Sequence, residues 1–153
     1  MDREALEAAL RESRAGLLRQ IESASAAQAS LLPAADEWSV IEILAHLVDT
    51  DYYYLGEALA MRDSHDHHFR YFDDESWKRT HPEVRRLPLD AVLDALAISH
   101  RTVLRVLATM DAEELSKRGT HPRGITYTVQ DVLYRLVPHD GTHEQQIRDA
   151  LRT

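Results

Sequence analysis

Hydrophobic residues recur at helical spacing in four long segments of this chain. The first spans about residues 3–23, where leucine and isoleucine return every three, four or seven positions after a capping Asp2. The second spans about residues 40–61. The third starts near Pro88, a residue tolerated in a first turn, and reaches about residue 107. The fourth runs from about residue 128 to residue 151, so the pattern predicts four amphipathic helices.

The second segment has the best-marked helix start. Ser39 can accept a hydrogen bond from the amide of Glu42 while the Glu42 side chain reaches back, which is a capping box. Trp38, just before this cap, is placed to pack on the first turn as a hydrophobic staple. Thr128 and Asp131 repeat the arrangement at the start of the fourth segment.

Four segments of this length predict an all-α fold. Each holds roughly 20 residues, or about 30 Å of helix. Together they predict a four-helix bundle that occupies residues 1–153 as a single domain. A long loop, residues 62–87, joins the second and third helices and is rich in Asp, His and aromatic residues; a shorter connection spans residues 111–127.

Composition narrows the possible classes of function. The net charge is −8, with 18 basic and 26 acidic residues, so we expect no nucleic-acid partner, which would need a positive surface. The chain has no cysteine, which excludes disulfides, thiolate zinc sites and a cysteine nucleophile. The N-terminal segment is a charged helical pattern rather than a signal peptide, and no apolar run is long enough to span a bilayer. We therefore expect a cytoplasmic protein with no membrane partner.

Histidines on apolar helix faces are the main candidates for chemistry. His139 and His143 lie four residues apart, which places their rings about 40° apart around the helix and about 6 Å apart along it. Pro138 disfavours a helix interior, but a helix that restarts there keeps both rings on one face. His46 lies beside the apolar face of the second helix, and His100 lies on that of the third.

One histidine on an apolar face is usually an ordinary core residue. A His-x3-His pair alone is a moderate indication of a metal site, because many helices carry such a pair by accident. A pair joined by a third interior histidine from a neighbouring helix is typical of a metal site, because three neutral imidazoles with an open position suit zinc or a related divalent metal. His100 fits a core histidine better than an extra ligand or a donor to one. The polar loop that holds His65, His67 and His68 has no apolar backing, so a solvated loop is the better interpretation.

Other polar residues flank these histidines. Asp49 and Thr50 follow His46 by three and four positions, so either can lie near it. The tyrosine run at residues 52–54 fits a position between core and rim, with one hydroxyl able to face the site. Asp140 is expected to face solvent.

These motifs together resemble the DinB/YfiT-like family of metal-binding four-helix proteins. The stretch EWSVIEILAHLVDTD has a Trp-Ser helix start followed by His46, and HDGTHEQQI has His139, His143 and Gln146 in a His-x3-His-x2-Gln pattern. The resemblance covers nearly the whole chain. It implies that His46, His139 and His143 bind one divalent metal, often zinc or nickel, with water completing the shell. It also implies, for part of the family, transfer or isomerisation reactions that use a low-molecular-weight thiol such as bacillithiol or mycothiol.

Three functions stay open on this sequence. A metal-dependent S-transferase would take its thiol from a small molecule, because the chain has no cysteine. A metal-dependent hydrolase would use metal-activated water, and a metal-binding stress protein would have no catalysis. We expect a small-molecule substrate and, since the resembled bundles commonly pair, a homodimer. We also expect residues 63–77 to cover one end of the bundle near the metal and to shape the substrate pocket.

Overall fold

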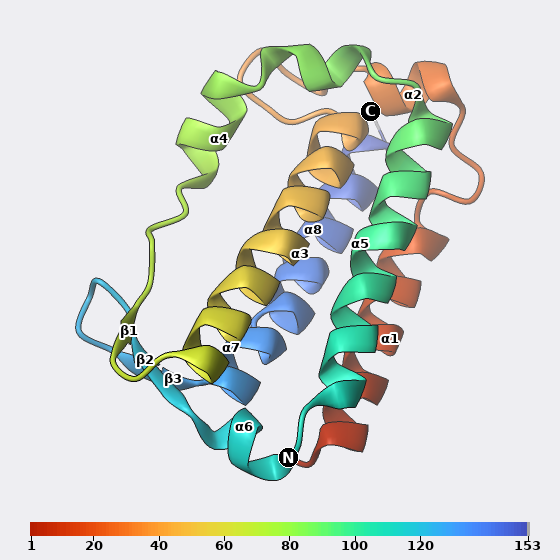
Figure 1. Ribbon diagram of the computed structural model, residues 1–153. Helices are drawn as coiled ribbons and strands as arrows, with labels where there is room; N and C mark the ends of the chain where they lie inside the picture. The colour runs from red at the N-terminus through yellow and green to blue at the C-terminus, as the bar shows by residue number, and fades with distance from the viewer. Residues whose placement is uncertain (153) are drawn as a thin grey trace.

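The computed structural model describes residues 1–152 and contains four long helical rods (Figure 1). Three are single helices, and the fourth has two parts: α1 (Arg3–Arg19), α3 (Val40–Asp63), α5 (Leu89–Thr109), and α7 (Val129–Tyr134) with α8 (Leu136–Ala150). The predicted all-α four-helix bundle is confirmed. Both capping boxes are also present, one formed by Ser39 and Glu42 and the other by Thr128 and Asp131. In the described part of the chain, every helix is too short or too polar to cross a membrane.

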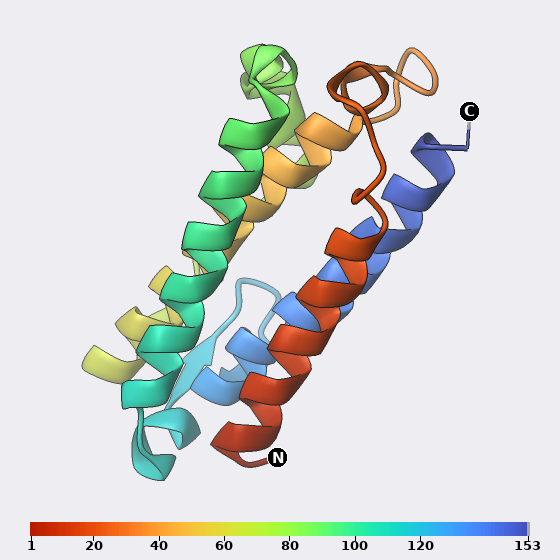
Figure 2. The same cartoon turned by 90° about the vertical axis from the view of Figure 1, so that its right-hand side faces the viewer.

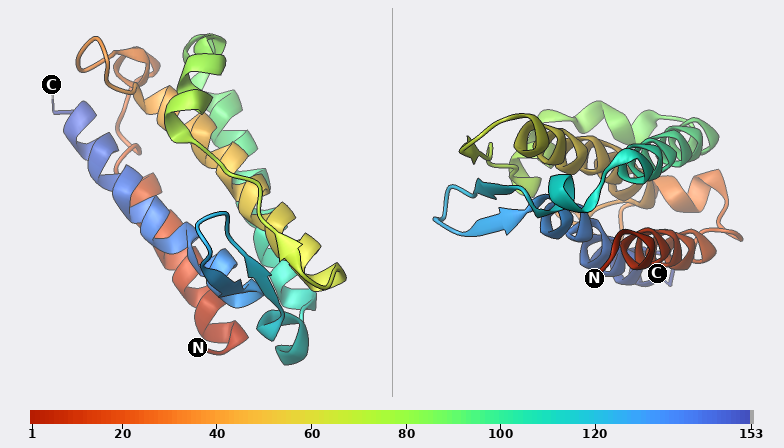
Figure 3. Two further views of the ribbon diagram at one scale, coloured as in Figure 1. Left: turned by 90° about the vertical axis from the view of Figure 1, so that its left-hand side faces the viewer. Right: turned by 60° about the horizontal axis from the view of Figure 1, so that its bottom comes forward.

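The directions of the rods explain why one connection is long. α1 and α8 lie side by side and point the same way, whereas α3 and α5 lie side by side and point the opposite way (Figure 2). Because α3 and α5 are parallel, the chain must return along the 24 residues of α3, about 36 Å, before α5 can start. Residues 64–88 make this return along the side of the bundle (Figure 3). The other connections join helix ends that already lie at the same end of the bundle.

The first rod is one turn shorter than its hydrophobic pattern predicts. α1 ends at Arg19 rather than near residue 23, because the amides of Gln20 and Ile21 bond to carbonyls three residues back and tighten the chain into turns. A short helix, α2 (Ala26–Ser30), follows with its own capping box. Ile21 still packs in the core from this turn, which is why the sequence there looked helical.

Both interhelix connections contain short elements that helical periodicity did not predict. The long one holds β1 (His67–His68), α4 (Asp74–Thr80) and the 3-10 helix η1 (Pro82–Arg86); the other holds α6 (Ala112–Ser116), β2 (Arg118–Thr120) and β3 (Thr126–Thr128). The strands form one small sheet in the order β1-β2-β3, with β1 parallel and β3 antiparallel to β2. Gly119, which pairs with both His67 and Tyr127, leaves the space that this packing needs. A Cβ there would lie 2.8 Å from the Cγ of Met61.

A buried ionic cluster lies between two apolar clusters of the core. On each of the four rods, one polar residue of this group falls between residues of the two apolar clusters. Arg14 donates to Asp51 at 3.1 and 2.8 Å and to Asp140 at 2.9 and 3.1 Å. Ser99 donates to Asp51 at 2.6 Å, and all four residues are at most 3% exposed. The expectation that Asp140 faces solvent is therefore wrong, because α8 packs this face on α1, where Arg14 compensates the charge.

Candidate metal centre

Three histidine side chains from two rods meet in the bundle interior. The capping box at Ser39 sets the start of α3, and His46 follows two turns later. Its Nε2 lies 3.3 Å from Nε2 of His139 in α8, which lies 3.1 Å from Nε2 of His143. These are the three histidines selected from the sequence. Within residues 1–152 they form the one group of three metal-ligating side chains whose donor atoms all lie within 4.8 Å of one another.

The interruption between α7 and α8 does not separate the histidine pair. It lies at Arg135, whose backbone stays helical with φ −56° and ψ −26°. Pro138 has no amide proton, but it stands in the first turn of α8, where a proline is tolerated. His139 and His143 therefore lie on one uninterrupted helix, one turn apart, and share a face as expected. His143 is 6% exposed, His46 is fully buried and His139 is half-buried.

Two of the three separations between these nitrogens fit a tetrahedral metal site. Zinc–nitrogen bonds of about 2.0–2.1 Å at tetrahedral angles place two ligand nitrogens about 3.3 Å apart. The two Nε2 separations of 3.3 and 3.1 Å match this value. The amide oxygen of Gln146 lies 2.7 Å from Nδ1 of His143, so this nitrogen donates and Nε2 keeps its lone pair. Nδ1 of His46 and of His139 are buried without a hydrogen-bond partner among the described residues, so polar contacts alone do not explain why these rings converge.

Burial keeps the three imidazoles neutral. The pKa of His46 falls to about 2 and that of His139 to about 3, mainly because burial disfavours the charged form, and neighbouring histidines add repulsion. Burial also lowers the pKa of His143, against an opposing hydrogen bond to Gln146. Oδ1 of Asp74 lies 3.5 Å from Nε2 of His46, but with a neutral ring this is a polar contact and not an ion pair. Neutral imidazole is the form that binds a metal.

Aromatic rings close the site around His46. The rings of Trp38 and Trp77 stack at 5.6 Å with an interplanar angle of 7°, and each centroid lies 5.1 Å from that of His46. Phe72 packs on the same imidazole at 5.6 Å. Asp49 accepts a hydrogen bond from Nε1 of Trp77 at 2.6 Å, so it anchors the long connection over His46.

The position expected for residues 63–77 is therefore half correct. They do lie against His46, as predicted. They cover a side of the bundle and not an end, because this segment carries the chain back from the end of α3 to the start of the parallel helix α5 (Figure 3). In the sequence Trp77 is only one of several aromatic residues in this connection, and no local signal pairs it with His46.

The site opens on the side of His139 into a cavity of about 310 Å³. This volume is at the lower end of the range for small-molecule sites, roughly 300–1,000 Å³. Tyr53 and Tyr54 line it, in line with the expectation that a tyrosine of this run faces the site, and the ring of Tyr54 lies 6.4 Å from that of His139. Asp74 and Arg135 also line it. Sequence reasoning missed both, because only the return of the long connection and the α7–α8 junction bring them here.

The other candidate histidines lie away from this group. His67 bonds at 2.5 Å to Glu57, a buried residue of α3, and so holds β1 against the bundle. His65 and His68 are exposed, as expected of a solvated loop. His100 is half-buried, and its pKa falls to about 4, first through burial and then through the charge of Arg14. It is not part of the three-histidine group.

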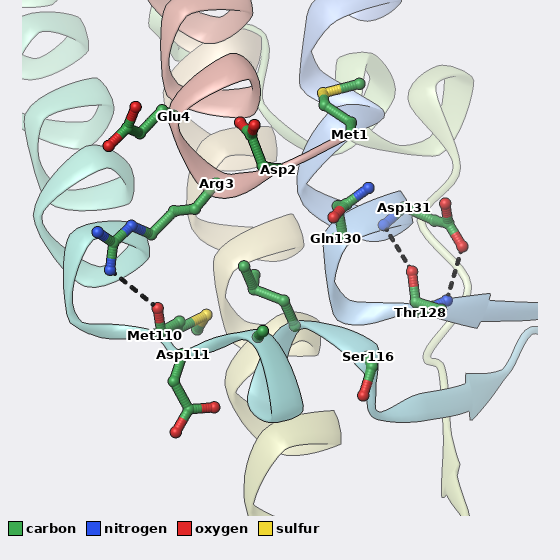
Figure 4. A pocket seen from close by; sticks show the side chains of 12 residues that line it. Met1, Asp2, Arg3, Glu4, Met110, Asp111, Ser116, Thr128, Gln130 and Asp131 are labelled. Carbon is green, nitrogen blue, oxygen red and sulfur yellow. Dashed lines mark hydrogen bonds between the residues drawn. The ribbon is translucent and has the colours of Figure 1, made fainter.

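A larger cavity of about 810 Å³ lies beside the N-terminal end of α1 (Figure 4). Three of its four acidic side chains already serve as helix caps: Asp2, Asp111 and Asp131 each accept a hydrogen bond from a backbone amide at the start of their own helix. Arg3 donates to the carbonyl of Met110 at 3.2 Å. Because most of its charged groups are engaged in this way and no histidine lines it, its size does not make it a candidate site.

Solved structures with the same fold include two with a described activity. YfiT from Bacillus subtilis, described as a probable metal-dependent hydrolase with an unusual four-helix bundle topology, has a TM-score of 0.79 at 20% identity, over 98% of this chain and 86% of that chain. A mycothiol-dependent maleylpyruvate isomerase has a TM-score of 0.79 at 13% identity, over 96% of this chain. This chain spans only 61% of the isomerase.

A third similar structure is an uncharacterised protein from Clostridium difficile 630, with a TM-score of 0.76 at 14% identity, over 97% of this chain and 95% of that chain. At these identities the likenesses establish the fold alone. No curated protein matches the sequence. The family model of the DinB superfamily matches residues 9–147, which is most of the chain. The chain therefore belongs to the DinB superfamily, the family that its histidine motifs resemble.

Proposed function

We propose that His46, His139 and His143 bind one divalent metal ion, zinc or nickel, and that the protein is a metal-dependent enzyme acting on a small molecule. The observation that carries this proposal is the convergence of three neutral imidazoles, with donor nitrogens within 4.8 Å of one another, beside an open cavity. When bound, the metal would polarise a substrate oxygen or lower the pKa of a thiol or water beside it.

Residues around the three histidines have separate tasks in this proposal. The hydrogen bond from His143 to Gln146 holds that imidazole in the tautomer whose Nε2 faces the other two. Trp38 and Trp77 exclude water from the side of His46. The cavity beside His139 leaves one side open for an incoming group.

The first assignment is an S-transferase that uses a low-molecular-weight thiol. The chain has no cysteine, so the thiol must come from a small molecule. A bulky thiol needs polar anchors beside the metal, and the cavity offers tyrosine hydroxyls. The similar isomerase is described as mycothiol-dependent, which supports this assignment.

The alternative is a metal-dependent hydrolase. A hydrolase needs a base near the attacking water, and Asp74 is the carboxylate that lines the cavity, 3.5 Å from Nε2 of His46. A stress protein that only stores or senses metal would need no substrate cavity, so the open side at His139 favours an enzyme.

Cobalt-substituted protein tests the thiol assignment directly. Addition of mycothiol, bacillithiol or glutathione should produce a new near-ultraviolet absorption band from sulfur-to-cobalt charge transfer, which reports a thiol in contact with the metal. His65→Ala should keep this band, and His139→Ala should lose it. If no thiol changes the cobalt spectrum but the zinc protein hydrolyses esters in a manner that Asp74→Asn abolishes, the S-transferase assignment is wrong and the hydrolase is correct.

A further inference from the structure

The cavity beside His139 carries two arginines that the proposed metal site does not use. Arg123 lies in the turn between β2 and β3, and Arg135 lies between α7 and α8. In residues 1–152, no carboxylate lies within ion-pair distance of either guanidinium. The protein as a whole is acidic, with a net charge of −8, so two unpaired guanidinium groups facing one cavity form a local exception.

Arg135 is an exposed residue whose guanidinium has an aromatic partner at the cavity wall. Its guanidinium carbon lies 5.8 Å from the ring centroid of Tyr127, and its charge partly offsets the burial that raises the pKa of Tyr54. The ring of Tyr54 meets that of His139 edge-on at 6.4 Å. One tyrosine therefore separates Arg135 from a proposed metal ligand.

The walls between these polar groups are aromatic and fixed. Phe69 and Tyr127 stack at 6.0 Å with an interplanar angle of 13°, and Tyr53 packs against Phe72 at 5.1 Å. The hydroxyl of Tyr53 donates to the carbonyl of Arg70, which ties this wall to the long connection. A cavity of about 310 Å³ with such sides favours a flat molecule over a branched one.

Among the described residues, only one acidic side chain lines this cavity. Asp74 is the one carboxylate among the lining residues, and it lies 3.5 Å from Nε2 of His46, at the proposed metal position. A divalent cation there would offset Asp74. The two guanidinium groups would then remain as positive charge without a partner, which an anionic ligand can supply.

We propose that this cavity binds a small organic carboxylate with a flat apolar body, whose carboxylate is held by Arg123 and Arg135 and whose body lies between the aromatic walls. The inference rests on the proposed function in one respect: the end of the molecule away from the carboxylate faces His139 and the metal. Arginine suits this task because its planar guanidinium matches a carboxylate with two parallel hydrogen bonds.

Isothermal titration with benzoate, phenylacetate and cinnamate tests this proposal, each against its uncharged amide. At least one carboxylate should bind the zinc-loaded protein, and its amide should bind about tenfold more weakly, the ratio expected for one charge-assisted hydrogen bond. Arg123→Gln and Arg135→Gln should each weaken carboxylate binding about tenfold and leave amide binding unchanged. Arg101→Gln, at an exposed position of α5, is the matched control and should bind like wild type. Inorganic phosphate, which is anionic but has no flat body, should bind more weakly than the best carboxylate.

The zinc-free protein separates this proposal from the metal assignment. A carboxylate that binds the arginines should still bind without zinc, and the two arginine variants should retain zinc as wild type does. If the carboxylates bind but the protein takes up no zinc, the metal assignment is wrong and the anion site is supported. The anion site is wrong if no carboxylate binds either form, if acid and amide bind alike, or if the arginine variants match wild type. Phosphate that binds as tightly as the best carboxylate would contradict the role of the aromatic walls.

Discussion

Replacement of Arg14 by methionine should destabilise the bundle more than any other single charge removal on α1. Arg14 is 3% exposed and makes four hydrogen bonds of 2.8–3.1 Å to Asp51 and Asp140, which belong to two other rods. Without the guanidinium, both carboxylates would remain in the core, 0% and 1% exposed, with no cation bonded to them.

The cost follows from these contacts. Removing one partner of a buried ion pair costs about 3–5 kcal/mol, because the remaining charge is left away from water. Methionine fills much of the space of the arginine stem, so a cavity adds little. We therefore expect the free energy of unfolding to fall by about 4 kcal/mol. At about 2–4 °C for each kcal/mol in a chain of this size, Tm should fall by about 12 °C.

Urea unfolding followed by circular dichroism measures this change. Arg11→Met is the control, since Arg11 lies on the same helix but pairs with Glu7 at the surface and its side chain is 61% exposed; its effect should stay within about 0.5 kcal/mol. Adding Asp51→Asn and Asp140→Asn to Arg14→Met should restore part of the loss, because the buried charges disappear. A loss below about 1 kcal/mol in Arg14→Met, or no recovery in the triple variant, would refute the reasoning.

Three further predictions concern acid stability, the aromatic cover and assembly. Burial holds the pKa of His46 at about 2, of His139 at about 3 and of His100 at about 4, so as pH falls below about 6.5 the unfolded chain takes up protons first and the metal-free fold loses stability. Equal urea midpoints at about pH 7 and about pH 5 would contradict this. Asp49→Ala should leave the Trp77 indole without its hydrogen-bond acceptor and lower the free energy of unfolding by about 1–2 kcal/mol. Tryptophan emission should then shift to the red, and unchanged emission would show that Asp49 does not anchor Trp77. Light scattering should give the mass of a homodimer, and a monomer of 17.5 kDa at micromolar concentration would refute it.

The starts of the long helices could be predicted because their signals are local. Ser39 and Thr128 cap their helices through residues three positions on, and the hydrophobic period fixes which face turns inward. The directions of the rods could not be predicted, because amphipathic periodicity is the same for parallel and antiparallel neighbours. The small sheet was missed for a similar reason, since its strands are two or three residues long and β1 pairs with a partner about 50 residues away.

The three histidines of the candidate site could be predicted from the sequence, but the side chains that surround them could not. His139 and His143 reveal their shared face through spacing alone, whereas the cover over His46 depends on Trp77, which a long return of the chain brings there. The buried ionic cluster did leave a signal in the sequence. Arg14 and Asp51 each interrupt an apolar helix face, and a charge at such a position needs a buried partner.

Zinc content after equilibrium dialysis tests the central claim, that His46, His139 and His143 hold one divalent metal. Mass spectrometry should find one zinc ion for each wild-type chain and for His65→Ala, whose side chain is exposed. His46→Ala, His139→Ala and His143→Ala should each lose tight binding while circular dichroism shows the helices retained, because the apolar clusters hold the bundle without the metal. Full zinc retention in His143→Ala would contradict the account.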